Sequence, residues 1–197
     1  MKDPIILPDD LVALTVLAFL VERPMHIYEV HRLIRQRGKS FIGGLPRSLY
    51  RAVERLERAG LVEVAETEKA EGRPERTVYR ATNDGAAELR TWLFALLSGA
   101  VEGEGLFNAA VSFLPFISPK SAQHHLRLRI GQLEGRLAPA ETTLREVGAY
   151  LPRLYLLEVE HERVLYQAEL DWLREVVEQI RSGELNWTPP TELVEEA

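Results

Sequence analysis

The stretch from Gly44 to Gly60, GLPRSLYRAVERLERAG, decides the fold of this chain. Successive helical residues are turned by about 100°, so the apolar side chains gather on one side and the arginines nearly opposite. The apolar side is made of Leu49, Ala52, Val53 and Leu56, and the arginine side of Arg47, Arg51, Arg55 and Arg58. The pattern predicts an amphipathic helix over residues 46–59, anchored by one face. A cationic helix of this size is what can enter the major groove of DNA.

Two helices are predicted before this stretch. Asp9 or Asp10 can cap the first, which begins at Leu11, is buried nearly all round and ends at Pro24. The second runs from about His26 to Arg37 and is ended by Gly38. Residues 39–46 then form a linker with two glycines and a proline.

A hairpin and a further helix are predicted after Gly60, which is a good C-cap. The β-favouring clusters 61–64 and 77–79 flank a polar stretch, 66–76, that would form a long tip. Thr82 caps the next helix, which reaches Leu97. The order helix, helix, helix, hairpin, helix is that of a winged helix-turn-helix, with residues 46–59 in the recognition position.

The second half of the chain is predicted to be helical. Ser118-Pro119 is a strong helix start, and apolar stripes follow over Leu126–Leu137 and Leu154–Ile180, with Pro139 and Pro152 punctuating the region. The fold class is therefore mainly α with a small β-hairpin wing. We predict a winged helix-turn-helix domain at 1–97, a linker at 98–105, a helical dimerisation domain at 106–183 and a mobile tail at 184–197.

Charge is distributed unevenly along the 197 residues, whose formal net charge is -6. Residues 1–95 hold 15 basic and 14 acidic side chains, whereas residues 96–197 hold 9 and 16. Residues 30–58 hold 8 basic side chains and 2 acids, and such a local patch decides nucleic-acid binding more than the total does.

Several classes of protein are disfavoured. The chain has no cysteine, which excludes disulfides and thiolate metal sites. The N-terminus does not resemble a signal peptide, and the apolar run Leu11–Val21 is too short to span a bilayer, so we expect a cytoplasmic protein without membrane contact. The five histidines match no metal-binding pattern, and no phosphate loop, nucleophile elbow or carboxylate pair appears. We expect no metal, no cofactor and no enzymatic activity.

Residues 11–93 resemble the N-terminal domain of the PadR family of bacterial transcriptional regulators. The likeness is carried by RPMHIYEVHRLI at 23–34, SLYRAVERLERAGLVE at 48–63 and GRPERTVYRATNDGAAELRTWL at 72–93. Ile27 departs from the family's usual glycine, and ATNDG at 81–85 from its usual LTEEG. The resemblance implies a homodimer that represses neighbouring genes from a pseudo-palindromic operator in double-stranded DNA. Several members release DNA when a small, frequently aromatic compound binds.

The candidate DNA contacts lie on the recognition helix and around it. Arg47 and Ser48 lie at the helix N-terminus, where backbone N–H groups also attract phosphate, and Arg51 and Arg55 continue the exposed face. The remaining candidates are Tyr50, Lys39 in the linker, and Arg73 and Arg76 at the wing tip. For Tyr50 a core-edge position remains the alternative, and for Lys39 an ordinary solvated charge.

Two further hypotheses concern the rest of the molecule. Trp92, Phe113 and Tyr155 could line an effector cavity, although aromatic side chains are more often core. The alternative to a DNA-binding repressor is a winged-helix protein-interaction module without specific DNA binding.

Overall fold

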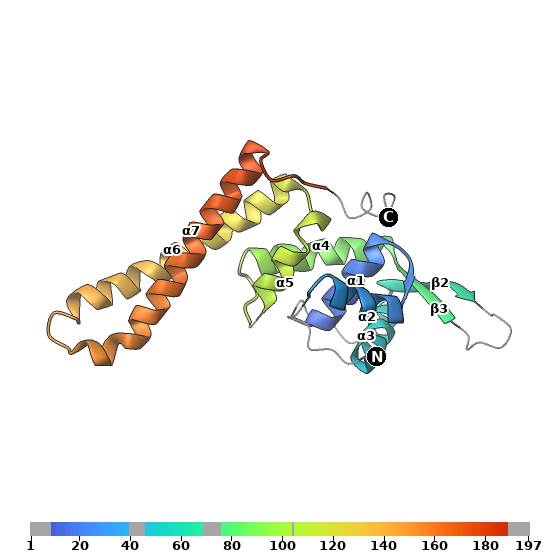
Figure 1. Ribbon diagram of the computed structural model, residues 1–197, viewed down its shortest axis with the longest axis horizontal. Helices are drawn as coiled ribbons and strands as arrows, with labels where there is room; N and C mark the ends of the chain where they lie inside the picture. Colours follow the sequence, from blue (N-terminus) through green and yellow to red (C-terminus); the bar gives the residue numbers. More distant parts are fainter. Residues whose placement is uncertain (1–8, 40–45, 69–75, 104, 189–197) are drawn as a thin grey trace. The chain divides into compact units, whose positions relative to one another are not determined.

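The computed structural model describes residues 9–39, 46–68, 76–103 and 105–188, and the chain forms two compact units (Figure 1). The first unit holds the described residues up to Ile117 together with Thr188, and the second holds residues 118–187. The units therefore divide after Ile117, not within residues 98–105. Helix α5 (Leu106–Ser112) belongs to the first unit because it packs against α4. Its residues Leu106, Ala109 and Ala110 are buried. Most of the tail predicted as mobile, residues 189–197, lies outside the described residues.

The first unit has the predicted order of elements. Its helices are α1 (Leu11–Glu22), α2 (Ile27–Gln36), α3 (Pro46–Arg58), α4 (Asn83–Leu97), α5 and the 3₁₀ turn η1 (Leu114–Phe116); its strands are β1 (Met25–His26), β2 (Val62–Glu68) and β3 (Arg76–Ala81). Strands β2 and β3 form the wing, which projects from the helices in Figure 1. The mainly α fold with a β wing is confirmed.

The sheet contains one strand more than the hairpin that the sequence predicts. Strand β1 pairs antiparallel with β3, Met25 opposite Tyr79 and His26 opposite Val78, so the sheet order is β1-β3-β2. A two-residue strand has no periodicity of its own to reveal it. The wing strands also extend further than expected, with Glu66 opposite Val78 and Glu68 opposite Arg76, because an exposed ladder tolerates polar side chains on both faces.

Helix α1 is the centre of the first unit's core. Every residue from Ala13 to Leu20 is buried, and α1 contacts α3, α4 and β3. Its N-cap is Asp10, whose Oδ1 accepts a hydrogen bond from the N–H of Ala13 at 3.0 Å. The predicted burial of this helix nearly all round is confirmed.

The turn between α3 and β2 is locked against the start of α4. Gly60 has φ +72°, a conformation that glycine adopts without strain, and ends α3 as expected. Thr82, the N-cap of α4, donates its N–H to Leu61 O at 3.0 Å and its hydroxyl to Gly60 O at 2.8 Å. A Cβ on Gly85 would lie 2.0 Å from Leu61 O, so only glycine permits this approach.

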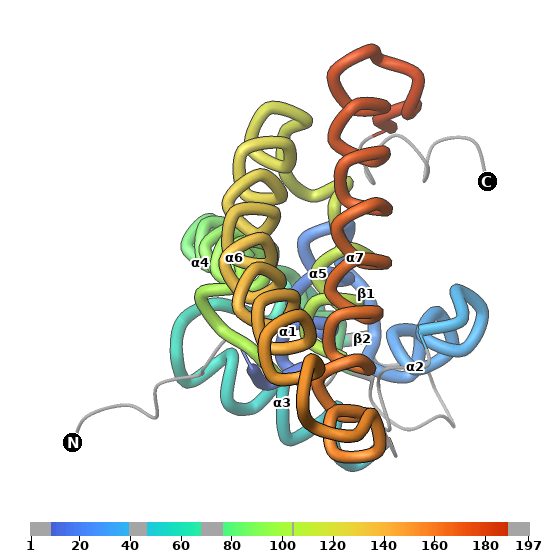
Figure 2. Tube along the Cα trace, turned by 90° about the vertical axis from the view of Figure 1, so that its left-hand side faces the viewer, coloured from blue at the N-terminus to red at the C-terminus, as the bar shows by residue number. Residues whose placement is uncertain are grey.

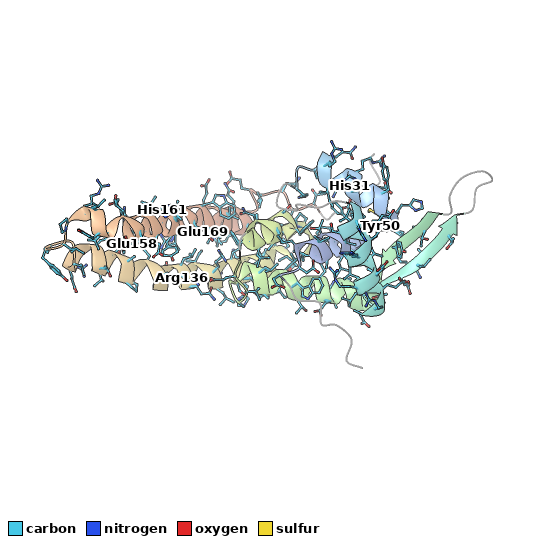
Figure 3. All side chains as sticks on the ribbon, turned by 90° about the horizontal axis from the view of Figure 1, so that it is seen from below. His31, Tyr50, Arg136, Glu158, His161 and Glu169 are labelled. Atoms are coloured by element: carbon cyan, nitrogen blue, oxygen red, sulfur yellow. The ribbon has the colours of Figure 1, made fainter. Side chains whose placement is uncertain are left out.

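The second unit is an antiparallel pair of long helices. Helix α6 (Pro119–Glu146) and helix α7 (Leu157–Ser182), which follows the 3₁₀ turn η2 (Arg153–Leu156), run side by side (Figure 2). Leu126 and Leu133 of α6 and Leu170 and Leu173 of α7 are buried. Arg129 Nε donates to Glu169 Oε1 at 2.5 Å across the pair, and Figure 3 shows Glu169 on α7.

Pro139 does not interrupt α6, contrary to the break expected there. The ring removes one backbone hydrogen bond and crowds the carbonyl four residues earlier. Leu133 and Ala140 are nevertheless both buried, so the packing of α6 continues past the proline. Tertiary packing therefore outweighs the local cost. Within the described residues, no helix has the length and hydrophobicity needed to cross a membrane.

We predict that Gly85→Ala lowers the free energy of unfolding of the first unit by about 2–3 kcal/mol, because the new methyl group would meet a backbone oxygen and not a movable side chain. Gly131→Ala in α6 is the matched control: a Cβ there meets nothing within 4 Å, and it should stabilise the helix by about 0.5–1 kcal/mol. Urea unfolding followed by circular dichroism compares the two variants. Equal stability of both would contradict the steric account of the α3–α4 junction.

Candidate nucleic-acid interface

Helix α3 has the two opposite faces that its sequence predicts. Leu49, Ala52, Val53 and Leu56 are at most 1% exposed, and the helix contacts α1 and α2. The other face carries Arg47, Arg51 and Arg58 into solvent. The core of the first unit therefore fixes which side of α3 is presented.

Three of the predicted contact residues lie on the outward face. Arg47 and Arg51 are exposed, and Tyr50 between them is 51% exposed and is shown on α3 in Figure 3. Ser48 lies beside them at the helix start and is half-buried. Arg47 and Arg51 make no ion pair with any residue that the structure describes. Their guanidinium groups are therefore available to a ligand that approaches this face.

Arg55 is engaged within the chain. Its Nη2 lies 2.5 Å from Oδ2 of Asp10, the residue that caps α1, and the two side chains are only 33% and 26% exposed. Sequence periodicity places Arg55 with the exposed arginines, but the residue lies toward the edge of the face, next to α1. A guanidinium held by a carboxylate is a poorer phosphate ligand than a solvated one.

Lys39 also turns away from solvent. Its Nζ donates to the backbone oxygen of Ser112 at 3.3 Å and to the hydroxyl of the same residue, and lies 5.3 Å from the centre of the Phe113 ring. Burial lowers the pKa of the Lys39 ammonium, and the nearby Arg37 lowers it further. Lys39 therefore connects the end of α2 to the end of α5, and we remove it from the predicted DNA contacts.

The neighbouring Arg37 is used in the same way. Its two terminal nitrogens donate to both carboxylate oxygens of Glu22 at 2.6 and 2.7 Å, and the Glu22 side chain is almost fully buried. The guanidinium lies 5.1 Å from the centre of the Phe19 ring, which meets Phe113 edge-on at 6.2 Å. The basic end of α2 is thus largely structural.

The wing contributes less than the sequence predicts. Arg73 lies outside the described residues, as does the side chain of Arg76, whose backbone belongs to β3. Arg80, which the sequence analysis did not select, donates its Nε to Glu63 Oε1 at 2.7 Å across the wing. The predicted roles of Arg73 and Arg76 stay predictions.

Two residues of the first unit were not selected in the sequence analysis. Tyr28 in the first turn of α2 is 74% exposed, although the inward positions Ile27, Val30 and Ile34 of the same helix already leave it on the outer side. Asp10 was considered only as a helix cap, and nothing in the sequence links it to Arg55, 45 residues later. The exposed position of Tyr28 could have been predicted from helical periodicity. The pairing of Asp10 with Arg55 could not.

The three aromatic residues suggested for an effector site have different surroundings. Trp92 and Phe113 are core residues of the first unit, and Trp92 Nε1 donates to Glu88 Oε1 at 2.7 Å. Tyr155 belongs to η2 of the second unit and is 63% exposed. Among the described residues, His, Asp and Glu side chains form no group that could hold a metal ion.

Comparison with known proteins identifies the N-terminal region. Residues 16–91 match the model of the transcriptional regulator PadR-like family, which confirms the resemblance for this part of the chain. No curated protein matches the sequence.

Several solved structures are similar to the chain at low sequence identity. Bacillus subtilis PadR in complex with operator DNA is 16% identical, with a TM-score of 0.39, over 86% of this chain and 98% of that one. The PadR-like transcriptional regulator BC1756 from Bacillus cereus is 15% identical, with a TM-score of 0.38, over 87% and 99%. Bacillus subtilis PadR in complex with p-coumaric acid is 15% identical, with a TM-score of 0.36, over 87% and 99%.

Proposed function

We propose that this chain, whose residues 16–91 are those of a PadR-like transcriptional regulator, is a sequence-specific DNA-binding repressor that acts as a homodimer in the cytoplasm. The observation that carries the proposal is the orientation of α3. Its apolar face is buried in the core, and Arg47, Tyr50 and Arg51 face solvent together. A helix held in this way can lie in the major groove with its N-terminal half toward the bases.

The outward residues divide into two kinds of contact. Arg47 and Arg51 can donate two parallel hydrogen bonds to a guanine edge, which is the commonest specific contact in the major groove. Ser48 at the helix N-terminus and the Tyr50 hydroxyl suit phosphate oxygens, which set the register of the protein on DNA. Arg73 and Arg76 of the wing would contact sugar-phosphate or the minor groove.

The second unit supports the dimer part of the proposal. Several large apolar side chains of α7 are exposed: Leu157, Val164, Leu165 and Trp172. Most of them fall at helical spacing along one helix, so they form an apolar stripe that a second copy of α7 could cover. A two-fold dimer would place its two recognition helices in successive major grooves, about 34 Å apart, on a pseudo-palindromic operator.

The effector part of the proposal rests on the family resemblance and on Tyr155. A small aromatic compound would release the repressor only if it bound the DNA-free arrangement more tightly than the DNA-bound one. Because Trp92 and Phe113 belong to the core, Tyr155 is the candidate of the three that solvent reaches best.

We predict that fluorescence anisotropy with DNA from the gene's own upstream region finds one segment bound tightly, with affinity that falls steeply as salt rises. Arg47→Ala with Arg51→Ala should remove the preference for that segment, since each lost bidentate contact costs about 1–3 kcal/mol. The matched control, Arg127→Ala with Arg145→Ala on α6, removes the same charge far along the chain and should keep the preference. Salt-independent binding, or no binding to any segment, would favour the protein-interaction module instead.

The dimer is tested by Leu165→Glu, which introduces a charge into the apolar stripe. Leu165 is 53% exposed in the single chain, so the variant should fold but sediment as a monomer at micromolar concentration. The control is Gln132→Glu, an equal change of charge at an exposed position of α6. A wild-type monomer, or a dimer that survives Leu165→Glu unchanged, would contradict this interface.

The effector is tested by adding phenolic acids and cationic aromatic compounds to the preformed protein–DNA complex. We expect at least one compound to lower the affinity for the operator, and Tyr155→Ala to reduce that response while leaving DNA affinity without the compound unchanged. If every compound of both classes leaves the affinity unchanged at millimolar concentration, the aromatic effector is wrong.

A further inference from the structure

The carboxylate of Asp10 makes two contacts that join two helices. Its Oδ1 accepts the N–H of Ala13 at 3.0 Å and so caps α1, and its Oδ2 lies 2.5 Å from Nη2 of Arg55 on α3. The Arg55 side chain is 33% exposed and the Asp10 side chain 26% exposed. This partial burial weakens the screening of the pair by water and salt. One side chain thus ties the start of the most buried helix to the recognition helix.

This tie supplies something that the apolar contact between the helices does not. Burial of Leu49, Ala52 and Leu56 sets which side of α3 faces the core, but the hydrophobic effect itself is non-directional and leaves room for small rotations of the helix. A charge-assisted hydrogen bond, in contrast, is directional, because donor and acceptor must be aligned. Arg55 lies at the edge of the apolar face, one turn after Arg51, so a fixed Arg55 restricts rotation of α3 about its own axis and therefore the direction of Arg51.

The pair also changes the charge that DNA would meet. Sequence periodicity counts Arg55 among the outward cations, but its guanidinium is neutralised by Asp10. The exposed cations of the described part of α3 are then Arg47 and Arg51 near its start and Arg58 at its end, so the charge near the start of the helix is that of Arg47 and Arg51. Concentrating charge where the bases are read favours specific over non-specific binding.

We propose that Asp10 and Arg55 form a positioning pair for DNA recognition: Asp10 withdraws Arg55 from the phosphates and fixes the rotation of α3, although neither residue contacts DNA. The inference rests on the proposed function, because it concerns the same recognition helix. It assigns a role in specificity to an acidic residue outside the helix-turn-helix, and it reverses the role that the sequence suggests for Arg55.

The experiment measures affinity for the operator and for a scrambled duplex over a salt series. Asp10→Asn keeps an equally good helix cap but loses the charge, Arg55→Gln loses the partner, and Arg51→Gln is the reference for a true DNA contact. Arg55→Lys is the conservative variant that keeps the ion pair. Circular dichroism and thermal unfolding confirm that every variant is folded before its affinity is compared.

The expected pattern separates positioning from contact. Arg51→Gln removes a cation that DNA meets, so it should lower the operator preference and also reduce the magnitude of the salt slope by up to about 1. Arg55→Gln should leave the slope unchanged and lower the ratio of operator to scrambled affinity about fivefold. Asp10→Asn should lower the ratio similarly and steepen the slope by up to about 1, because Arg55 is released toward the phosphates. Asp10→Asn with Arg55→Gln should lose no more specificity than either change alone, and Arg55→Lys should stay near wild type.

Two outcomes would overturn the pair. A slope that falls in Arg55→Gln as much as in Arg51→Gln would make Arg55 a direct contact, and additive losses in the double variant would make the two residues independent. If the wild-type protein shows no sequence preference, the proposed function fails, and hydrogen exchange on the DNA-free protein still tests the pair. Asp10→Asn and Arg55→Gln should then each speed exchange of the α3 amides relative to those of α4, and unchanged rates would refute the inference.

Discussion

The burial of α1 on every side is the constraint on which the first unit depends. Helices α3 and α4 and strand β3 all contact it, so each of them has to direct its apolar side chains toward one helix. A close-packed interior leaves little freedom for its members to shift. The outer face of α3 is therefore set by the core, and the cationic side chains Arg47 and Arg51 face outward because Leu49 and Leu56 are buried.

The basic residues around α3 serve two purposes that their sequence does not distinguish. Arg37, Lys39 and Arg55 each have a partner within the first unit: Glu22, Ser112 and Asp10. A charge that is removed from water is costly without such a partner, and the buried member is Glu22 in the Arg37 pair, whereas Lys39 and Arg55 are themselves half-buried. Arg47 and Arg51 remain exposed without an ion pair to any described residue, so some basic residues of the patch at 30–58 have partners within the unit and others are available to a ligand.

Helix caps and hydrophobic periodicity predicted most of the fold. The elements that they did not predict depend on segments distant in the sequence. Asp10, Thr82 and Ser118 cap the helices that follow them, as expected, since capping depends on a few neighbouring residues. Strand β1 and the continuation of α6 past Pro139 were not predicted. Both depend on a partner distant in the chain: β3 pairs with β1, and α7 packs along α6. Local propensity carries no information about such partners.

The sequence by itself determined that residues 46–58 form a helix with an apolar and a cationic face, because apolar and cationic residues recur there at helical spacing. It also determined the wing that follows and the family to which residues 16–91 are matched. Only the tertiary structure decided which cations are available. Arg55 meets Asp10 across 45 positions, and Lys39 meets Ser112 across 73. Pairings of this kind follow from how helices pack in three dimensions, which no spacing along the chain specifies.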